Sequence, residues 1–450
     1  MKFWSFSDPN VIWVSLGAVL LGMSASVIGG FAFLRKRSLM GDALAHAALP
    51  GVMTAFILFQ SNNPLLMFFG ASFSSLMGLF LMDWLPKHSK IKPDAAMAIT
   101  LSFFFALGLM QLSYIQGLEV EGKSGLDKIL FGQAAAMLPS DVTVLSIVAS
   151  VVLCVVTVFF QKLRLITFNR LYAQSLGLNI IFYEIVLALL VVMSVVIGLQ
   201  IVGVVLMAAV LLTPIAAARF WSQNLSTMLV TAAFMGGLSG LLSANISYMA
   251  PAMPTGPWMV VVLSLIFMLS FLFAPKKGLL ANLLKQYQLR RQVCEENVLR
   301  TLYILNERHP KNRGNTREDV ALTIDFSEAD ILTLRHLGLG ELKQTLKRLL
   351  QKGWLLQKKS IGFIRLSSQG AEQAISLTRR HRLWESYLTE QLSLSSDKVH
   401  YSAERIEHLL SDEQTQQLEA DLAVSSHHYF DPHGKPIPTD LSRLKKKEKE

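Results

Sequence analysis

Long apolar segments separated by short polar ones fill the first 275 residues of the chain. Nine such segments occur, at residues 11–34, 42–60, 64–85, 94–115, 140–161, 183–199, 201–220, 225–248 and 256–275. Most are long enough to cross a hydrocarbon core of about 30 Å as helices. The 183–199 segment is short, so the pattern predicts either nine membrane spans or eight spans and a re-entrant piece.

Basic residues between the apolar segments indicate how the chain is oriented. Because Lys and Arg stay on the cytoplasmic side of a membrane, their clusters mark alternate connections as cytoplasmic. The clusters are Arg35–Arg37, Lys87–Lys92, Lys162–Arg170, Arg219 and Lys276–Lys277. Nine spans then place the N-terminus outside and everything after residue 275 in the cytoplasm.

Charge density changes after residue 275. Residues 1–275 hold 22 Asp, Glu, Lys and Arg residues, whereas residues 276–450 hold 52 of them and eight of the ten histidines. The chain, 52% hydrophobic overall, therefore combines a membrane part with a soluble part. The soluble part has 29 Lys and Arg against 23 Asp and Glu, which suits nucleic acid or lipid headgroups and equally a solvated basic face. The distant pair Cys154 and Cys294 predicts neither a disulfide framework nor a CxxC metal site.

The stretch "GLEVEGKSG", residues 117–125, has the spacing of a phosphate-binding loop. Such a loop needs a buried strand before it and a helix after it, but the preceding run "AAMAITLSFFFALGLMQLSYI" has the length of a membrane helix. Glu119 and Glu121 would also put negative charge where phosphate binds. We expect an extracytoplasmic turn at Lys123 and no nucleotide bound by this chain.

Two ionisable residues begin the second apolar segment, in "RKRSLMGDALAHAALPG", residues 35–51. Asp42 and His46 are four apart, so a helix places them on one face. Ionisable groups in an apolar span are costly and mark functional sites, and a carboxylate with an imidazole suits Mn, Fe(II) or Zn. The alternative is that Asp42 caps the helix and His46 is a satisfied core histidine.

The soluble part contains the element order of a winged helix-turn-helix domain in "DILTLRHLGLGELKQTLKRLLQKGWLLQKKSIGFIRLSSQG". A helix, a turn at Gly338 and Gly340, a second helix and two short strands follow one another. The second helix of this motif enters the DNA major groove. The candidate DNA-binding residues are Lys343, Lys347 and Arg348 for phosphate and Gln344 and Thr345 for bases. The same fold also serves as an interaction module.

Metal-binding chemistry recurs in "RRHRLWESYLTEQLSLSSDKVHYSAERIEHLLSDE", residues 379–413. Three pairs of His and Glu are four residues apart and would line two helices with nitrogen and oxygen ligands. The pairs are His381 with Glu385, His400 with Glu404, and Glu404 with His408. One such pair is ordinary solvated surface, but three together indicate a metal site.

The membrane part resembles the permease of bacterial ABC transporters for manganese, zinc and iron. The resemblance rests on "RKRSLMGDALAHAALPGV", "FNRLYAQSLGLN" at 168–179 and "GLQIVGVVLMAAVLLTPIAAAR" at 198–219. It implies that Asp42 and His46 lie on the translocation path. It also implies a separate ATPase subunit, an extracytoplasmic metal-binding protein, a second permease subunit and a location in the bacterial inner membrane. The implied ATPase-coupling residues are Phe168, Asn169, Ala173, Leu176, Gly177 and Leu178.

Residues 290–440 resemble the DtxR-type metal-dependent repressors, through "RHRLWE", "DKVHYSAERIEHLLSD" and "PHGKPIP". The resemblance implies one site made by His381, Glu385 and His400 and another made by Glu404, Glu407 and His408. It also implies a dimer that binds operator DNA. Two positions depart from iron-responsive members. Asn297 stands where the family has an Asp or Met ligand, and Glu404 replaces a Cys, as in manganese-responsive members.

The predicted fold is an all-α polytopic membrane domain with eight or nine spans, followed by a winged helix-turn-helix domain and a helical metal-binding and dimerisation domain. The predicted boundaries are 1–275 for the membrane domain, 276–295 for a basic linker, 296–370, 371–440, and 441–450 for a charged tail.

The predicted function is that of a permease subunit importing Mn, Fe(II) or Zn, with the same ion acting as co-repressor for the C-terminal domain. The alternatives are a C-terminal domain that gates transport without binding DNA, and a membrane part that only anchors a regulator. Proteolytic release near residues 276–295 is a further hypothesis, because a DNA-binding domain that is tethered to the membrane cannot easily reach an operator.

Overall fold

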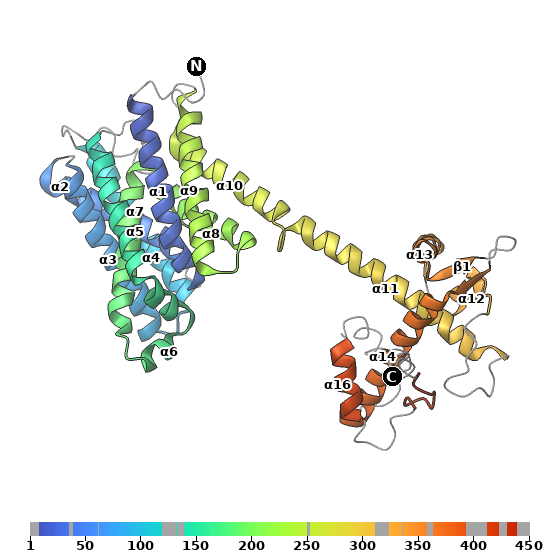
Figure 1. Cartoon of the computed structure of the whole chain (residues 1–450). Coiled ribbons are helices and arrows are strands. Elements are labelled where there is room, and N and C mark those ends of the chain that lie inside the picture. The colour runs from blue at the N-terminus through green and yellow to red at the C-terminus, as the bar shows by residue number, and fades with distance from the viewer. Residues whose placement is uncertain are drawn as a thin grey trace. The chain divides into compact units, whose positions relative to one another are not determined.

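The structure is a computed structural model that describes residues 9–35, 39–61, 63–118, 132, 139–249, 253–310, 324–335, 337–357, 363–392, 412–422 and 430–438. The chain divides into two compact units, Met1–Asn282 and Leu283–Glu450 (Figure 1).

The first unit is entirely helical where it is described. Within those ranges, nine helices are long and apolar enough to cross a membrane, so the predicted all-α polytopic fold is confirmed with the higher of its two span counts. The short 183–199 segment belongs to a full-length helix, α7. The nine are α1 (Pro9–Leu34), α2 (Met40–Phe59), α3 (Pro64–His88), α4 (Pro93–Gly117), α5 (Pro139–Phe168), α7 (Ile180–Ile201), α8 (Val204–Trp221), α9 (Leu225–Tyr248) and α10 (Thr255–Phe273), and a short helix, α6 (Arg170–Ser175), lies between α5 and α7.

Local sequence signals fix where several of these helices begin. The Asn63, Asn169 and Asn179 side chains each accept a hydrogen bond from a backbone N–H in the first turn of α3, α6 and α7. Asn is among the best residues for this capping role. Pro64 and Pro93 occupy the first position of α3 and α4, where the missing N–H of proline costs no helical hydrogen bond.

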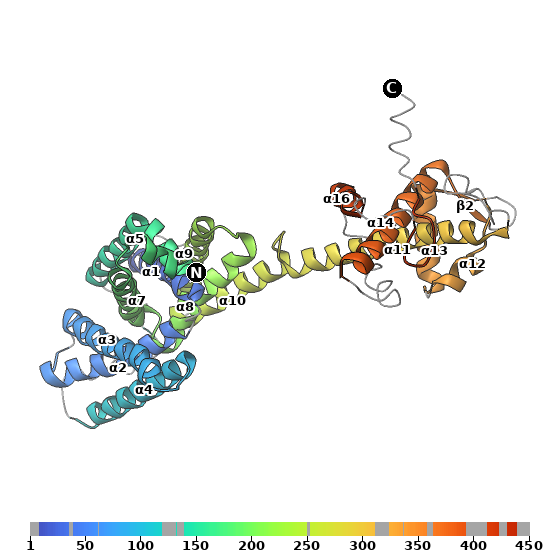
Figure 2. The same cartoon turned by 90° about the horizontal axis from the view of Figure 1, so that it is seen from below.

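The membrane helices form two groups. Helices α2, α3 and α4 pack against one another, and α1 packs against α5, α8 and α9 (Figure 2). Gly22 of α1 faces Gly236 of α9 so closely that a Cβ atom on either would overlap the backbone of the other. Small residues allow membrane helices to approach to backbone contact, which stabilises the α1–α9 pair by packing.

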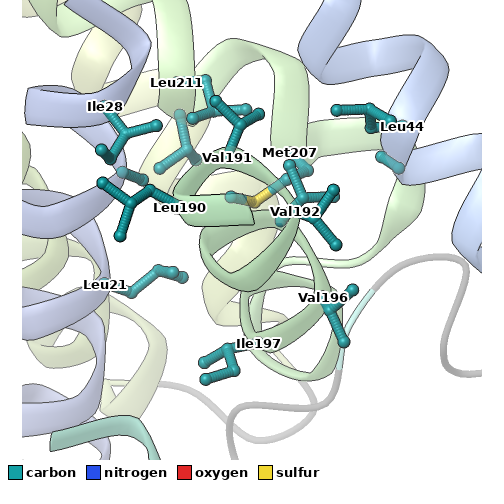
Figure 3. Packing of buried hydrophobic residues seen from close by; sticks show 14 of the residues in the cluster. Leu21, Ile28, Leu44, Leu190, Val191, Val192, Val196, Ile197, Met207 and Leu211 are labelled. Carbon is teal, nitrogen blue, oxygen red and sulfur yellow. The ribbon is translucent and has the colours of Figure 1, made fainter. Parts of the chain in front are cut away.

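Helix α7 lies in the core between the two groups. Its buried side chains, among them Val191, Val192 and Val196, pack against α1, α2 and α8. Figure 3 shows these residues with Leu21 and Ile28 of α1, Leu44 of α2, and Met207 and Leu211 of α8. Only the C-terminal half of α7 is enclosed in this way, because Ile181, Phe182 and Ile185 near its start are at least half exposed.

The second unit has its own core. Its elements are α11 (Leu279–Arg308), of which the residues from Leu283 onward belong to this unit, α12 (Glu328–Leu334), α13 (Leu339–Gln351), β1 (Leu355–Gln357), β2 (Ile364–Leu366), α14 (Ser368–Leu392) and α16 (Asp412–Leu422). Strands β1 and β2 are antiparallel, with Leu355 opposite Leu366. Leu302, Ile331 and Leu346 bring α11, α12 and α13 into one cluster with these strands. Helix, turn, helix and hairpin follow in the predicted winged-helix order.

Candidate metal sites

The pair predicted in the membrane part forms as expected. Asp42 and His46 lie one turn apart on α2, with His46 Nε2 and Asp42 Oδ1 separated by 3.4 Å. Helix α2 begins at Met40 after Leu39, which makes no side-chain cap, so Asp42 does not have the capping role of the alternative interpretation. Helix α2 packs against α3, α4, α7 and α8, and the pair therefore lies on an enclosed helix.

The His46 side chain is only partly satisfied. It is 8% exposed, and its Nδ1 atom is buried without a hydrogen-bond partner among the described residues. The edge of the ring contacts Phe105, with the centroids 4.6 Å apart. The other ring nitrogen, Nε2, is the one that lies beside the Asp42 carboxylate, and an imidazole nitrogen with a carboxylate is a donor set that fits a divalent metal ion.

The predicted coupling segment forms a short helix with well-defined ends. Asn169 caps α6 by accepting a hydrogen bond from the Tyr172 N–H at 3.0 Å. At the other end, Gly177 adopts a φ of 74° and the Leu178 N–H donates to the Ala173 carbonyl at 3.2 Å. A positive φ favours glycine, which explains the "SLGL" sequence at this turn.

Around α6 the structure exposes apolar side chains. Ala173 is buried, which anchors the helix, while Asn169 and Gly177 are exposed. The exposed apolar residues are Phe168, Leu171, Tyr172 and Leu176, each more than half exposed. Exposed apolar side chains so close together in sequence make this segment a candidate interaction site.

An ion-pair cluster that sequence reasoning missed joins α6 to two other elements. Glu184 of α7 accepts from Arg170 of α6, with nitrogen–oxygen distances of 3.3 and 3.4 Å. Its Oε1 atom also lies 4.0 Å from Nη1 of Arg35, directly after α1. The available signal was that Glu184 is the one acidic residue between Asp141 and Glu295 in the sequence.

In the second unit, His381 and Glu385 lie one turn apart on α14. Their Nε2 and Oε1 atoms are 2.9 Å apart, and the residues are 3% and 2% exposed. Asn297 of α11 has a buried Oδ1 atom that has no hydrogen-bond partner within the part of the chain that the structure describes. The buried nitrogen and carboxylate donors and the unpaired amide oxygen fit a metal ion.

A cavity of about 570 Å³ includes His381 and Glu385 and is lined by α11, α14 and the turn at residues 431–435. Arg382 is one of the residues that line this cavity, and hydrogen bonds hold its side chain in place. Its Nη2 atom donates to Glu307 at 2.7 Å, and its Nη1 atom donates to the Pro436 carbonyl at 2.6 Å. Burial would lower the pKa of Arg382, but the hydrogen bonds and charge of Glu307 outweigh burial, so the pKa is raised. This paired arginine holds α14 to α11 and to the "PHGKPIP" segment, a contact that the sequence pattern does not reveal.

Four of the predicted sensor ligands, His400, Glu404, Glu407 and His408, lie outside the described residues. Among the described ones, no group of three or more His, Cys, Asp and Glu side chains is arranged to hold a metal ion. The predicted turn at Lys123 also lies outside them, although the helix predicted before it is confirmed as α4, which ends at Gly117.

Only part of the predicted DNA-binding face of α13 is exposed. Lys343, Gln344 and Lys347 face solvent. Thr345 is buried and its hydroxyl donates to the Glu341 carbonyl at 2.8 Å. Arg348 donates to Glu295 of α11 at 2.7 Å, so its guanidinium holds α13 to α11.

Similarity to known proteins supports both halves of the chain. Residues 7–274 match the ABC 3 transport family. Residues 367–439 match the iron dependent repressor, metal binding and dimerisation domain. Both resemblances drawn from the sequence motifs are thereby confirmed.

Individual relatives agree with this division. The chain is 36% identical over 401 residues to the manganese transport system membrane protein MntC of Bacillus subtilis, covering 88% of this chain and 89% of that protein. It is 37% identical to the zinc transport system membrane protein TroC of Treponema pallidum, covering 62% of this chain and 93% of that protein, so little of TroC is left to correspond to the second unit. The solved structure of PsaBC from Streptococcus pneumoniae in complex with Fab is 32% identical, with a TM-score of 0.53, and the match covers 59% of this chain and 91% of that one. With nine candidate spans and a family match over most of its length, this chain is a multi-pass membrane protein that belongs to the ABC 3 transport family.

Proposed function

We propose that this chain is the permease subunit of an ATP-driven importer of a divalent metal ion, with Asp42 and His46 as ligands on the path. The observation that carries the proposal is the Asp42–His46 pair on the enclosed helix α2, with His46 Nε2 3.4 Å from the Asp42 carboxylate. The matched relatives are named for manganese and zinc, and the donor set suits Mn, Fe(II) or Zn.

Two protein ligands suit transport better than storage. An ion that must cross has to bind well enough to enter and weakly enough to leave. A carboxylate and an imidazole fill two coordination positions of the ion. Water, or other ligands that the ion contacts briefly as it crosses, can fill the remaining positions. A closed site with four protein ligands would hold the ion instead.

The same proposal assigns the partners. An ATPase subunit docks on the exposed apolar residues around α6 and hydrolyses ATP, so this chain is not itself an enzyme. A second permease subunit completes the path, and an extracytoplasmic binding protein supplies the ion. The basic clusters support an orientation with the C-terminal unit in the cytoplasm, and we propose the bacterial inner membrane as the location.

Uptake of radioactive Mn²⁺ tests the transport site in cells that lack other importers and express the partner subunits. Asp42→Ala and His46→Ala should each lower the initial rate roughly tenfold or more, because each removes one ligand. Asp94→Ala and His88→Ala are matched controls, since both residues are exposed, and should transport normally. Near-normal uptake by the Asp42→Ala, His46→Ala double variant would reject the site and favour a membrane part that only anchors a regulator.

For the C-terminal unit we infer a metal-sensing role, with boundaries at residues 296–370 for the winged helix and 371–440 for the metal-binding domain. His381 and Glu385 with His400, and Glu404 with Glu407 and His408, are the proposed ligands. The match of residues 367–439 to a metal binding and dimerisation domain supports this role. Asn297 adds an oxygen donor from α11.

We propose DNA as the target of this unit because α13 carries Lys343, Gln344 and Lys347 on its exposed face. Lysines on the second helix of a winged-helix motif contact phosphate, and Gln is suited to an adenine edge. The competing proposal is a gate that slows transport when metal is abundant. The unit's own core and the likeness of its metal-binding half to a repressor domain are compatible with both.

Gel retardation of the full chain in lipid nanodiscs separates the two proposals. With Mn²⁺, the chain should retard DNA from its own promoter, and Glu407→Ala should abolish this. Replacing Lys343 and Lys347 by Ala should reduce the slope of log affinity against log salt by about 2, whereas Lys285→Ala should not. The absence of retardation at low salt with Mn²⁺ or Fe(II), together with uptake that responds to Glu407→Ala, would favour the gate.

A further inference from the structure

An arginine occupies the metal-ligating face of His381. Arg300 of α11 places its Nη2 atom 2.8 Å from Nε2 of His381, the same nitrogen that lies 2.9 Å from Oε1 of Glu385. All three residues are at most 3% exposed. A permanent cation is therefore enclosed with the two side chains that are proposed to bind a metal cation.

Arginine and a metal ion would use one and the same lone pair. The guanidinium group can only donate and the Glu385 carboxylate can only accept, so His381 Nε2 accepts from Arg300 when it carries no proton and donates to Glu385 when it carries one. A metal ion binds an imidazole through the unprotonated nitrogen. Because one lone pair cannot serve both, a metal ion at Nε2 has to displace the Arg300 hydrogen bond and the positive charge beside it.

We propose that Arg300 is an internal competitor that sets the metal affinity of the His381–Glu385 site. In the metal-free chain, its guanidinium stabilises the Glu385 carboxylate and the His381 lone pair. Metal binding expels the guanidinium and so breaks a contact between α11 and α14. This inference rests on the proposed role of His381 and Glu385 as metal ligands.

Arg300, whose contact with His381 would be displaced, lies on α11, and α11 also forms ion pairs with α13. Glu295, five residues before Arg300, accepts from Arg348 Nε at 2.7 Å and from Lys352 Nζ at 2.5 Å. Both donors belong to the C-terminal end of α13 and the residue after it. A shift of α11 on release of Arg300 would therefore reach α13 through the ion pairs of the buried Glu295, all within the second unit.

Mn²⁺ titration of the purified full chain in detergent tests the competition, with free Mn²⁺ measured by electron paramagnetic resonance. Asp42→Ala and His46→Ala remove the proposed path site, and His381→Ala defines which part of the binding belongs to the sensor site. Arg300→Gln and Arg300→Met should bind Mn²⁺ at that site about tenfold more tightly, the effect of losing one charge-assisted hydrogen bond. Arg300→Lys keeps the cation and should stay near the wild-type affinity.

A second readout is the thermal stability of the chain with and without metal. In EDTA, Arg300→Gln should lower the unfolding temperature of the chain, and Mn²⁺ should raise it by more than in wild type. Arg379→Gln removes a partly buried arginine of α14 that pairs with Glu419 at 2.5 Å, and should leave the Mn²⁺ affinity unchanged.

The outcomes distinguish the competitor role of Arg300 from the proposed role of His381 and Glu385 as metal ligands. The competitor role would be overturned if wild type, Arg300→Gln and Arg300→Met showed His381-dependent binding of equal affinity. The proposed metal-sensing role of His381 and Glu385 would then still hold. No His381-dependent binding in any variant would overturn both. Tighter binding in Arg300→Lys to the same extent as in Arg300→Gln would show that packing, not charge, sets the affinity.

Discussion

Single buried charges join the elements of the second unit. Glu295 is 5% exposed and Arg382 is 3% exposed, and each is held by more than one polar partner. Removing one partner of a buried ion pair costs about 3–5 kcal/mol, because the other charge is left desolvated and unpaired. These residues therefore resist substitution even though neither is a proposed ligand.

Cys294 is a residue whose chemistry is changed by its neighbours. Burial raises the pKa of its thiol, and the Glu341 carboxylate, which accepts the S–H hydrogen bond at 3.3 Å, raises it further. A raised pKa means less thiolate at a given pH, and the thiolate is the nucleophile. Arg290 and Arg348 act in the opposite direction without reversing the shift.

Alkylation by iodoacetamide measures this effect in a chain with Cys154→Ser. At pH 8, Cys294 should react roughly tenfold more slowly than a small free thiol, and its rate should still rise above pH 9. Glu341→Gln removes the charge and the strong acceptor, so its rate–pH curve should move to lower pH. A wild-type curve that coincides with that of the free thiol would contradict the assigned environment.

Sequence spacing predicted residue pairs but not residue clusters. Asp42 with His46 and His381 with Glu385 follow from the helical repeat alone, because residues four apart share a face. The contact between Arg300 and His381 joins positions 81 apart, and no local pattern encodes it. The burial of Thr345 and the pairing of Arg348 were likewise set by packing against α11, which a linear pattern of basic residues does not contain.

At the scale of elements, Glu184 connects three pieces of the membrane unit. Its carboxylate lies on α7, and it meets Arg170 of α6 and Arg35 after α1. Arg35 is followed within five residues by α2, which carries Asp42. A movement of α6 driven by an ATPase would thus be passed to the α1–α2 connection through ion pairs as well as through the chain.

Glu184→Gln should uncouple the two activities of the assembled transporter. We expect Mn²⁺ uptake to fall several-fold while ATP hydrolysis is retained, because the ion pairs are lost but the apolar docking residues of α6 remain. Glu184→Asp keeps the charge and should recover much of the uptake. The control is Arg164→Gln, an exposed charge on α5. Uptake and hydrolysis that fall together, with Glu184→Asp no better, would indicate a folding defect instead.

Membrane helices were the most predictable elements, because apolar length alone decides whether a helix can span. The segment at 183–199 was ambiguous because it is short, yet the Asn179 cap starts the helix at Ile180 and the helix runs on to Ile201. Helix α6 was predicted only through a resemblance. Six residues carry too little periodicity to define a helix by themselves.

For the whole molecule, the change of composition after residue 275 predicted two units. The family match ends at residue 274 and the first compact unit at Asn282. What the sequence could not supply was how the second unit is held together, because its buried charges come from segments far apart in the chain. The ligands between residues 400 and 408 stay predictions.

The division of the buried residues between the two units has a genetic consequence. Among the described residues, each buried hydrophobic cluster lies within one unit, one in the first and two in the second, so a substitution that empties part of a cluster acts on the unit that contains it. Substitutions that abolish metal import and substitutions that abolish metal sensing therefore fall in different halves of one gene. In a cell that makes both, a pair of such chains would still contain one intact copy of each half.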